Sequence, residues 1–403
     1  MSFDQIVALT VLGVVVAALI HGRLRADVVA LAGAAALLAT GVVRPVEAQA
    51  AFASPAILAL ASLFVIAYAL ELSGLLDALI RGAVGLSRRL GSAGVWIAIT
   101  LCGGASAFLN NTPIVVLAAP VVQTMARSLN QSPKRYLIPL SYVTILGGSC
   151  TLIGTSTNLL VNDMARNAGQ PGFRIFDITP VALTIAAAGA LYLFLFAPRL
   201  LRRTEGEPPP APAPEGVGER GVQFVGDADL FSERRPLNLR RGLAALAVFV
   251  AVVAVAALGW APIAAAAFTG AVLLVLLRVI TAEEAYSGLR PEVLLLIAGM
   301  IVIGVSLEVS GLAATATEAS TGVVGQLSPL LALAVLYGVT LFLTEILSNA
   351  TVAVLLTPVA VALAESLGVS PQPFIVCVMM AASAAFATPF GYQTNVLVYQ
   401  LGK

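Results

Sequence analysis

Apolar runs of roughly 18–20 residues, the length that a helix needs to cross a bilayer, recur along the whole chain. Of the 403 residues, 59% are hydrophobic and only 11% are charged, whereas soluble proteins average about 45–50% and about 25%. This pattern predicts an all-α polytopic membrane protein. It excludes soluble enzymes, nucleic-acid-binding proteins and secreted disulfide scaffolds, and the formal net charge of +1 gives no reason to expect a polyanionic partner.

Cysteine and histidine are too few, and too widely spaced, to predict a metal centre. Cys102, Cys150 and Cys377 lie in apolar segments without metal-ligand spacing, so they are interpreted as small buried hydrophobic residues. The single histidine is His21. Residues 1–20 lack a basic n-region and a following A-x-A cleavage site, which predicts a first transmembrane helix and not a removed signal peptide.

Two long apolar stretches differ from the other spans because polar, helix-breaking motifs interrupt them. The other spans are predicted over residues 4–21, 27–43, 55–74, 136–160, 177–197, 241–259, 262–280, 291–309 and 372–400. The interrupted stretches are 91–126, broken at Asn110-Asn111-Thr112-Pro113, and 328–364, broken at Ser348-Asn349-Ala350-Thr351. Each has about 36 residues, fewer than the roughly 40 that two crossings and a turn require. Both are predicted to be re-entrant helical hairpins, and 136–160 and 372–400 to be broken helices.

Basic residues indicate the orientation of these spans, since loops rich in Lys and Arg stay in the cytoplasm. With the N-terminus outside, all of the 22 basic residues fall inside except Arg44, Arg166 and Arg174. The flanks of the first hairpin are basic, which predicts that it enters from the cytoplasm. The flanks of the second, near Glu318 and Glu365, are acidic or neutral and are predicted to face outside.

The two halves of the chain resemble each other at a nearly fixed spacing. The matches, at offsets of 237 or 238 positions, are Glu71 to Leu75 with Glu308 to Leu312, Asn111 and Pro120 with Asn349 and Pro358, Ser132-Pro133 with Ser370-Pro371, and Gly154 to Asn158 with Gly391 to Asn395. Because the hairpins are predicted to open toward opposite sides, the halves are interpreted as inverted-topology repeats. Such repeats are typical of secondary transporters that bind their substrates at broken helices.

This repeat predicts the domain organisation. The expected parts are an N-terminal transmembrane helix, 1–26, a first inverted repeat, 27–198, a linker, 199–241, and a second inverted repeat, 242–403. The linker has five prolines between Glu205 and Glu215 and is expected to be cytoplasmic and flexible. The first repeat ends with the span 177–197, whereas no equivalent last helix follows Asn395 in the second.

The breaks in the spans are the predicted binding site. Non-helical backbone survives at membrane depth only where protein or a water-filled cavity satisfies it. The two hairpin tips and the interruptions at 154–158 and 389–395 offer hydroxyl, amide and carbonyl oxygens for a hard monovalent cation. Their half-helix N-termini favour an anion. A cation and an anion bound side by side offset each other's desolvation, which favours cation-coupled anion uptake.

Three of these polar stretches also carry a resemblance to a known family. They are 106–113, with Asn110-Asn111-Thr112, 146–158, with Gly154-Thr155-Ser156-Thr157-Asn158, and 387–395, with Gly391-Tyr392-Gln393-Thr394-Asn395. The chain resembles the divalent anion/sodium symporter family of the ion transporter superfamily, and within it the bacterial sulfate-permease-like branch. The resemblance implies an elevator-type homodimer in a bacterial-type inner membrane, with a scaffold domain and a transport domain that holds both hairpins. It implies symport of sulfate or a dicarboxylate with sodium ions, and no further cofactor.

The resemblance also assigns site residues. The family's Ser-Asn-Thr motif falls on Asn110, Asn111 and Thr112 in the first hairpin and on Ser348, Asn349 and Ala350 in the second. The first sodium site would use Ser106, Asn110, Asn111 and the carbonyl of Gly154, and the second would use Thr344, the carbonyl of Leu347, Asn349 and the carbonyl of Gly391. The anion would contact both motifs together with Thr155 and Tyr392.

Two positions depart from the family's motif. Asn110 stands where the family has a serine, and Ala350 stands where it has a threonine. Because carboxylate recognition in the family uses those side chains, a smaller tetrahedral oxyanion such as sulfate is favoured over a dicarboxylate.

The main alternative function is proton-coupled transport or antiport, as in arsenite or sodium/proton exchangers of the same superfamily. Such proteins would need a central aspartate or a cluster of carboxylates, and no aspartate lies inside the predicted spans away from their ends. Glu345 is the best single candidate for a proton carrier, because its counterpart in the first repeat is Ala107. Glu71 and Glu308 lie at matched helix ends, where structural pairing is favoured.

Two further classes are an intramembrane enzyme and a channel. The chain has no His-Glu-x-x-His motif and no serine near His21, so a nucleophile would lack its base. The enzyme alternative is therefore disfavoured. Saturable, gradient-dependent flux would separate a carrier from a channel.

Overall fold

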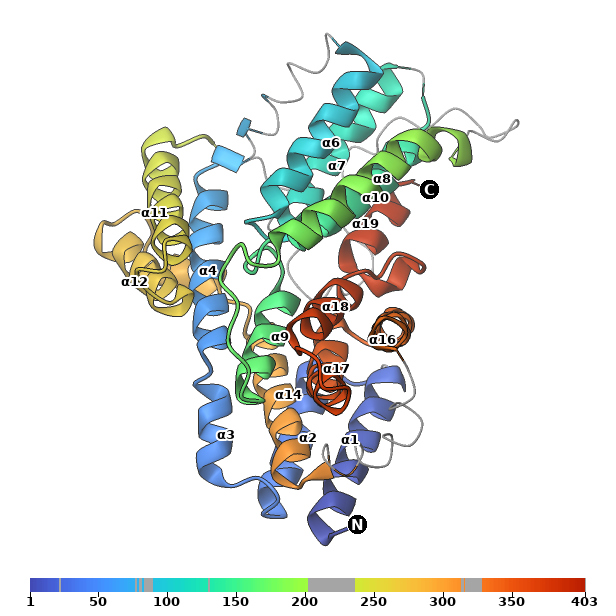
Figure 1. Ribbon diagram of the computed structural model, residues 1–403. Helices are drawn as coiled ribbons and strands as arrows, with labels where there is room; N and C mark the ends of the chain where they lie inside the picture. The colour runs from blue at the N-terminus through green and yellow to red at the C-terminus, as the bar shows by residue number, and fades with distance from the viewer. Residues whose placement is uncertain are drawn as a thin grey trace.

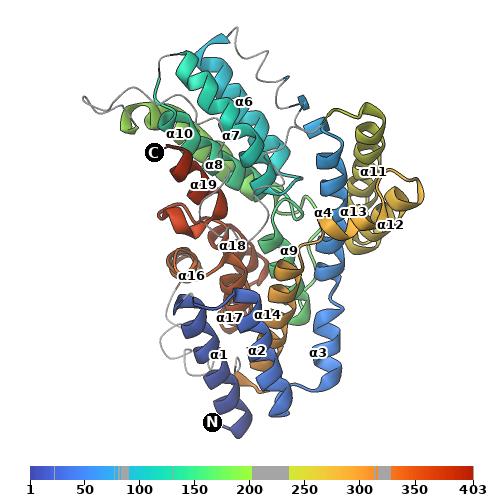
Figure 2. The same cartoon turned by 180° about the vertical axis from the view of Figure 1, so that it is seen from behind.

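The computed structural model describes residues 1–21, 23–76, 78–79, 82, 90–129, 131–201, 236–312, 315 and 328–402. Most of the predicted linker, 202–235, lies outside these residues. No strand occurs in the described part, and its helices form an elongated bundle with the two termini toward opposite ends (Figures 1 and 2).

The helices follow the predicted spans. Their bounds are α1 Phe3–His21, α2 Ala26–Ala39, α3 Pro45–Phe52, α4 Pro55–Leu72, α6 Ser92–Ser106, α7 Asn111–Ser128, α8 Lys134–Gly148, α9 Ser156–Asn167, α10 Thr179–Leu200, α11 Leu239–Ala257, α12 Ile263–Leu276, α13 Ala282–Gly288, α14 Pro291–Val309, α16 Pro329–Thr344, α17 Asn349–Ser366, α18 Gln372–Ala382 and α19 Gln393–Gly402, with a 3₁₀ turn at Pro389–Gly391. Each predicted span corresponds to a helix or to a pair of helices with a break between them. Six helical segments are long and apolar enough to cross a membrane, which confirms the prediction of a multi-pass membrane protein.

Both predicted hairpins are pairs of helices joined by a short tip. In the first, α6 ends at Ser106 and α7 begins at Asn111; in the second, α16 ends at Thr344 and α17 begins at Asn349. Side chains at the tips cap the returning helices. Asn110 accepts a hydrogen bond from the N–H of Thr112 at 3.2 Å, and Ser348 accepts one from the N–H of Thr351 at 3.2 Å. These caps satisfy backbone donors that a helix beginning inside the bundle would otherwise leave free.

The predicted end of the span 136–160 is wrong by about two turns. The broken helix continues as α9 to Asn167. It therefore contains Asp163, which is only 5% exposed. An aspartate thus lies buried in a helix of this protein, in contrast to the expectation that the spans hold none away from their ends. The polar run Asn162-Asp163 lowers the hydropathy there, which is why the apolar pattern stops early.

Two short helices, α3 and α13, have no counterpart among the predicted spans. Both are too short to cross a bilayer, so a search for long apolar runs passes over them. The start of α13 has a capping box between Thr281 and Glu284, a spacing that could have been recognised in the sequence.

The elements recur at the spacing found in the sequence. α7 and α17 begin and end 238 positions apart, at Asn111 and Asn349 and at Ser128 and Ser366. α4 and α14 end 237 positions apart, and each is followed by a serine and then by a glycine with positive φ, 68° at Gly74 and 73° at Gly311. The repetition of the elements thus agrees with the repetition of the motifs, and Glu71 and Glu308 lie at matched helix ends as expected.

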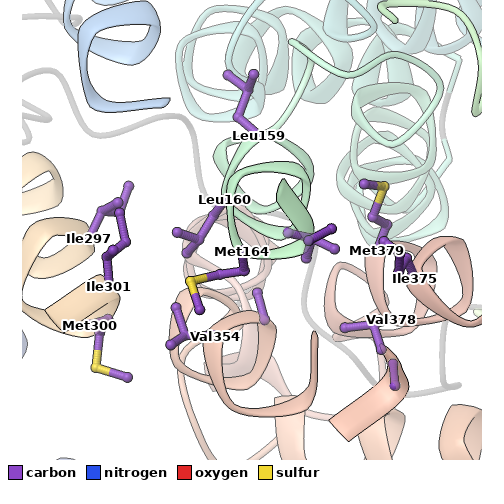
Figure 3. Packing of buried hydrophobic residues seen from close by; sticks show 14 of the residues in the cluster. Leu159, Leu160, Met164, Ile297, Met300, Ile301, Val354, Ile375, Val378 and Met379 are labelled. Carbon is purple, nitrogen blue, oxygen red and sulfur yellow. The ribbon is translucent and has the colours of Figure 1, made fainter. Parts of the chain in front are cut away.

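Buried apolar side chains form three main clusters. One joins α6, α7 and α8 with α19, a second joins α4 with α11, α12 and α13, and the largest joins α2, α9, α14, α17 and α18. Figure 3 shows Leu160 and Met164 of α9 facing Ile301 of α14 on one side and Val354 of α17 below. The three cysteines are buried and free, as predicted. α9 therefore connects the second hairpin to α14 through an apolar, well-packed interface.

Contacts between distant segments divide the helix ends and loops into two groups. One group joins Gln5 to Thr315 at 3.0 Å and Gln170 to Glu365 at 3.1 Å, and the other joins Ser73 to Asn238 at 2.8 Å and Arg241 to Glu284 at 3.7 Å. Each contact joins positions that the pattern of basic residues places on the same side of the membrane. The absolute orientation stays a prediction.

Candidate ion and anion site

The tip of the first hairpin carries a buried pair of polar side chains. Ser106 and Asn111 are 0% and 1% exposed, and the hydroxyl of Ser106 donates to Oδ1 of Asn111. The amide nitrogen of Asn111 in turn donates to the hydroxyl of Tyr392 at 2.9 Å. The predicted pair from the first repeat is thus connected to a predicted residue 281 positions away in the second repeat.

The break between α8 and α9 closes against this tip at Gly154. A Cβ at Gly154 would lie 2.4 Å from the carbonyl oxygen of Gly148 and 2.6 Å from that of Ala107, so only glycine permits this approach. The hydroxyl of Thr151 donates to the carbonyl of Ala107 and accepts from the N–H of Gly154 at 3.1 Å. The break and the hairpin tip are therefore one packed unit with several carbonyl oxygens in it.

Asn158 supports the same break from inside α9. Its amide nitrogen donates to the carbonyls of Thr151 at 2.9 Å and Ser149 at 3.3 Å. Its Oδ1 is buried and has no hydrogen-bond partner among the described residues. Asn395, at the matched position of the second repeat, donates in the same manner to the carbonyl of Ala385 at 2.8 Å.

The tip of the second hairpin contains a cluster of oxygen atoms. Oγ1 of Thr344 lies 2.9 Å from Oδ1 of Asn349 and 2.7 Å from the carbonyl oxygen of Ala382. One hydroxyl proton cannot serve both acceptors fully. Ser383, the next residue, is 2% exposed, and its Oγ has no partner in the described part of the chain. This concentration of neutral oxygens suits a hard monovalent cation.

Glu345 has a structural role that the sequence did not predict. One carboxylate oxygen accepts the N–H of Ala387 at 2.7 Å, and the other accepts the N–H of Thr388 at 2.9 Å. Tyr142 donates to the carbonyl of Phe386 in the same segment at 2.6 Å. Glu345 thereby fixes the break between α18 and α19 to the tip of the second hairpin. In the first repeat the counterpart of Glu345 is Ala107, and there Thr151 joins the hairpin tip to the break.

A pocket lies at the N-terminus of α9. Its lining combines predicted and unpredicted residues: Leu60, Leu63, Phe64, Ala67, Phe108, Leu109, Asn110, Ile153, Gly154, Thr155, Ser156, Phe249 and Tyr392. The side chain of Tyr392 lies close to that of Thr155 in this lining. The N-cap, Thr155, makes no capping hydrogen bond, so the first N–H groups of α9 are available at the pocket wall. None of these lining residues is charged.

The pocket brings together only part of the predicted site. Asn110, Gly154, Thr155 and Tyr392 line it, and Ser106 and Asn111 lie directly behind through the contact with Tyr392. Thr112 faces Gln393, with 3.5 Å between the side-chain oxygens. The predicted residues of the second hairpin and of the break after α18 do not line this pocket; they are Thr344, Leu347, Ser348, Asn349 and Ala350 of the hairpin and Gly391 of the break.

Sequence reasoning missed the apolar half of the pocket and several backbone oxygens. Phe64 of α4 and Phe249 of α11 carry no pattern that separates them from lipid-facing residues. The carbonyls of Ala107, Gly148 and Ala382 could not be found either, since a carbonyl is exposed by a break and not by a residue type. In the part of the chain that the structure describes, no three Cys, His, Asp or Glu side chains gather to hold a metal ion.

Comparison with known proteins places this geometry in a family. The family model CitMHS, described as citrate transporter, matches residues 15–368. The chain belongs to the citrate transporter family. The broken helices, the polar hairpin tips and the pocket at the N-terminus of α9, from here on the central pocket, therefore belong to a member of a transporter family. The predicted relationship to anion transporters of the ion transporter superfamily is confirmed.

Similar proteins agree with this membership. An uncharacterized transporter of Synechocystis sp. is 27% identical over an alignment of 547 positions, which covers 93% of this chain and 89% of that protein. An uncharacterized transporter of Escherichia coli K12 is 28% identical over 246 residues, 60% of this chain and 39% of that protein. Sodium/sulfate cotransporter 2 of Chlamydomonas reinhardtii is 42% identical over 97 residues, 22% of this chain and only 11% of that protein.

Proposed function

We propose that this protein is a sodium-coupled symporter of a small divalent anion, with sulfate favoured over dicarboxylates. The anion would lie in the pocket at the start of α9, and sodium ions would occupy the oxygen clusters at the two hairpin tips. The partly similar sodium/sulfate cotransporter of Chlamydomonas supports the choice of both ions.

The observation that carries this proposal is the absence of charged side chains among the residues that line the pocket. A divalent anion in such a place has the partial positive charge of the α9 N-terminus, worth about half an elementary charge, and no cationic side chain. The remaining negative charge must be offset, because an unpaired ion in a low-dielectric interior is strongly unfavourable. Cations bound next to the pocket supply that charge, and this requirement couples anion binding to cation binding.

The first cation site would lie at the closed junction of the first tip and its break. Its ligands would be Oγ of Ser106, Asn110, Oδ1 of Asn111 and the carbonyl of Gly154, with the carbonyls of Gly148 and Ala107 close by. Asn111 also bonds to Tyr392, which lines the pocket. A cation that orders Asn111 would therefore order Tyr392, and the anion and the cation would each favour the binding of the other.

The second cation site would lie at the second tip. Its ligands would be Oγ1 of Thr344, Oδ1 of Asn349 and the carbonyls of Leu347 and Gly391. The carbonyl oxygen of Ala382, 2.7 Å from Oγ1 of Thr344, adds a further oxygen to this cluster. Oγ of Ser383, which has no hydrogen-bond partner among the described residues, adds a further oxygen that could bind the cation. Ser348 and Ala350 would contact the anion from the second tip. In the elevator motion that we propose, the transport domain with both hairpins would move as one body against the scaffold domain of a homodimer.

The size of the pocket supports a small anion. Its free volume is about 50 Å³, a few times the 10–15 Å³ or so that one water needs. A tetrahedral oxyanion fits such a space more readily than an extended dicarboxylate or a tricarboxylate such as citrate, and Asn110 and Ala350 depart from the motif that recognises carboxylates. Citrate and succinate are the competing substrates that the test includes.

The test is uptake of radiolabelled sulfate into proteoliposomes, with sodium or potassium outside. We expect saturable uptake that needs inward sodium, that unlabelled citrate inhibits weakly, and that Asn111→Ala and Asn349→Ala each lower about tenfold or more. The matched control is Asn167→Ala, an exposed asparagine at the end of α9 that lines neither pocket. Equal uptake in potassium, or uptake driven by a proton gradient alone, would contradict sodium coupling; uptake of citrate or succinate but not sulfate would contradict the choice of anion.

A further inference from the structure

A second pocket, of about 250 Å³, lies at the other end of α9. Its lining comes from the last two turns of α9, the first residues of α4, the loop between α11 and α12, and the segment 173–175 that leads to α10. No role in the proposed transport cycle is assigned to it so far. Along α4 it begins at Pro55, whereas the central pocket extends to Ala67, so both pockets lie on one interface between α4, α9 and α11.

The charges on its lining have a net positive sign. Arg166, Arg174 and Asp163 line the pocket. The carboxylate of Asp163 accepts a hydrogen bond from the hydroxyl of Ser54 at 2.6 Å. Arg166, three residues further along α9, is close enough to interact electrostatically with that carboxylate. Neither guanidinium forms a salt bridge with a carboxylate within the described ranges, which leaves cationic groups available to a ligand. In contrast, the central pocket has no charged lining residue.

Segment 173–179 connects the two pockets. The N–H of Phe173 donates to Oδ1 of Asn162 at 2.7 Å, and the N–H of Leu152 donates to the carbonyl of Ile175 at 3.0 Å. The ring of Phe176 packs edge-on against Phe108, with 6.2 Å between centroids, and Phe108 lines the central pocket. The segment that carries Arg174 is therefore attached both to the first break and to the first hairpin tip.

Arg166 and Arg174 are also two of the three basic residues that the positive-inside pattern leaves outside. We propose that this pocket is an outer recruitment site, in which the two guanidiniums hold a small divalent oxyanion before it passes to the central pocket. Positive charge in a cleft with low-dielectric walls focuses the field and raises the local concentration of an anion, and guanidinium binds oxyanions through paired N–H groups. Leu152 and Leu159, which are both buried, also line this second pocket.

This inference rests on the proposed symport of an anion, and its first test is kinetic. In right-side-out vesicles at low ionic strength, we expect Arg166→Gln and Arg174→Gln to raise the half-saturating sulfate concentration about three- to tenfold, and to change the maximal rate less. The effect should shrink at about 0.5 M salt, because exposed charges are then screened. Arg174→Lys should keep more of the wild-type value than Arg174→Gln.

The matched control is Arg44→Gln. Arg44 is the third basic residue on the same predicted side, but it pairs with Glu47 and lines neither pocket. We expect its half-saturating concentration to equal that of the wild type. An equal rise in Arg44→Gln would attribute the effect to general surface charge, and no rise in either pocket variant would remove the pocket's role; either result overturns the inference and leaves the symport proposal intact.

A binding measurement keeps the inference testable without transport. In detergent, sulfate at constant ionic strength should raise the thermal unfolding temperature of Asn111→Ala, whose central site is impaired. The rise should disappear when Arg166→Gln and Arg174→Gln are added to that background. Its absence in Asn111→Ala, or its persistence in the triple variant, contradicts the recruitment site whether or not the wild type transports sulfate.

Discussion

At the scale of single residues, the site depends on places where a side chain is missing as much as on side chains that are present. Gly154 lets the first break approach Gly148 and Ala107 so closely that their carbonyl oxygens occupy the space that a Cβ at position 154 would need. The motif with Asn110, Asn111 and Thr155 could be recognised from the sequence because these residue types are rare in apolar spans. The contacts that Gly154 makes could not, since they join backbone atoms from three segments.

We expect Gly154→Ala to lower stability by about 1–3 kcal/mol, because the added methyl group overlaps two backbone oxygens that cannot move aside. Sodium-dependent uptake should be lost with it. Thermal unfolding of the purified protein measures the first effect. The control is Gly104→Ala in α6, where a Cβ meets nothing within 4 Å; if both variants unfold alike, the close packing at Gly154 is not what stabilises the site.

A substitution at Glu345 distinguishes a structural role of this side chain from a role as proton carrier. Both of its oxygens accept backbone N–H groups, and a glutamine keeps one acceptor and presents a donor to the other N–H. We expect Glu345→Gln to lower uptake at every pH and to leave the shape of the pH profile unchanged. Uptake is measured between pH 5 and 9 or so, with the exposed Glu283→Gln as control. A profile that becomes flat in Glu345→Gln alone would identify this carboxylate as a proton carrier.

At the scale of elements, the helices were more predictable than their ends. Both hairpins were found because polar tips interrupt long apolar runs, and α7 and α17 begin at the predicted Asn111 and Asn349. The end of α9 was placed too early because burial of Asp163 depends on α4, which is distant in the sequence. The apolar wall from Phe64 and Phe249 was invisible for the same reason: hydropathy does not distinguish a residue that faces a pocket from one that faces lipid.

Ser54 shows how one side chain stabilises two elements. It accepts the N–H of Ala56 at 3.1 Å as the cap of α4 and donates to Asp163 of α9. We expect Ser54→Ala to lower the free energy of unfolding by about 2 kcal/mol or more, because it removes a cap and leaves a buried carboxylate without its hydroxyl. The exposed cap Ser328→Ala in α16 should cost about 1 kcal/mol, and chemical denaturation compares the two. Equal losses would mean that the bond to Asp163 adds nothing.

At the scale of the whole molecule, the contacts between helix ends and loops all agree with one assignment of the segments to the two sides of the membrane. Gln170 bonds to Glu365 and Asn238 to Ser73, as the distribution of basic residues predicts. The fold class and the repeat spacing followed from the sequence because hydropathy and motif order are local signals. Association of two chains leaves no such signal, since a contact surface and a lipid-facing surface have the same composition.

Opposite orientation of the hairpins can be tested with cysteine labelling. Ser128 and Ser370 are exposed beyond the body of the first and second hairpin. We expect Ser128→Cys to react with a membrane-impermeant maleimide only from the cytoplasmic side, and Ser370→Cys only from the outer side. The native Cys102, Cys150 and Cys377 are buried, and the unsubstituted protein measures their background. Labelling of both positions from one side would rule out inverted repeats.

The central pocket is lined by hydroxyl, amide and backbone groups of the first tip, the first break and Tyr392, and by hydrocarbon side chains of α4 and α11. The oxygen atoms expected to hold the first cation belong to these hydroxyl, amide and backbone groups or lie directly behind them. Replacements at Leu60, Phe64 or Phe249 would therefore reshape the space for the cargo without touching the ion ligands. If the proposed sites hold, such replacements would change the range of anions and leave the bound cations in place, so that substrate range and energy coupling would change independently.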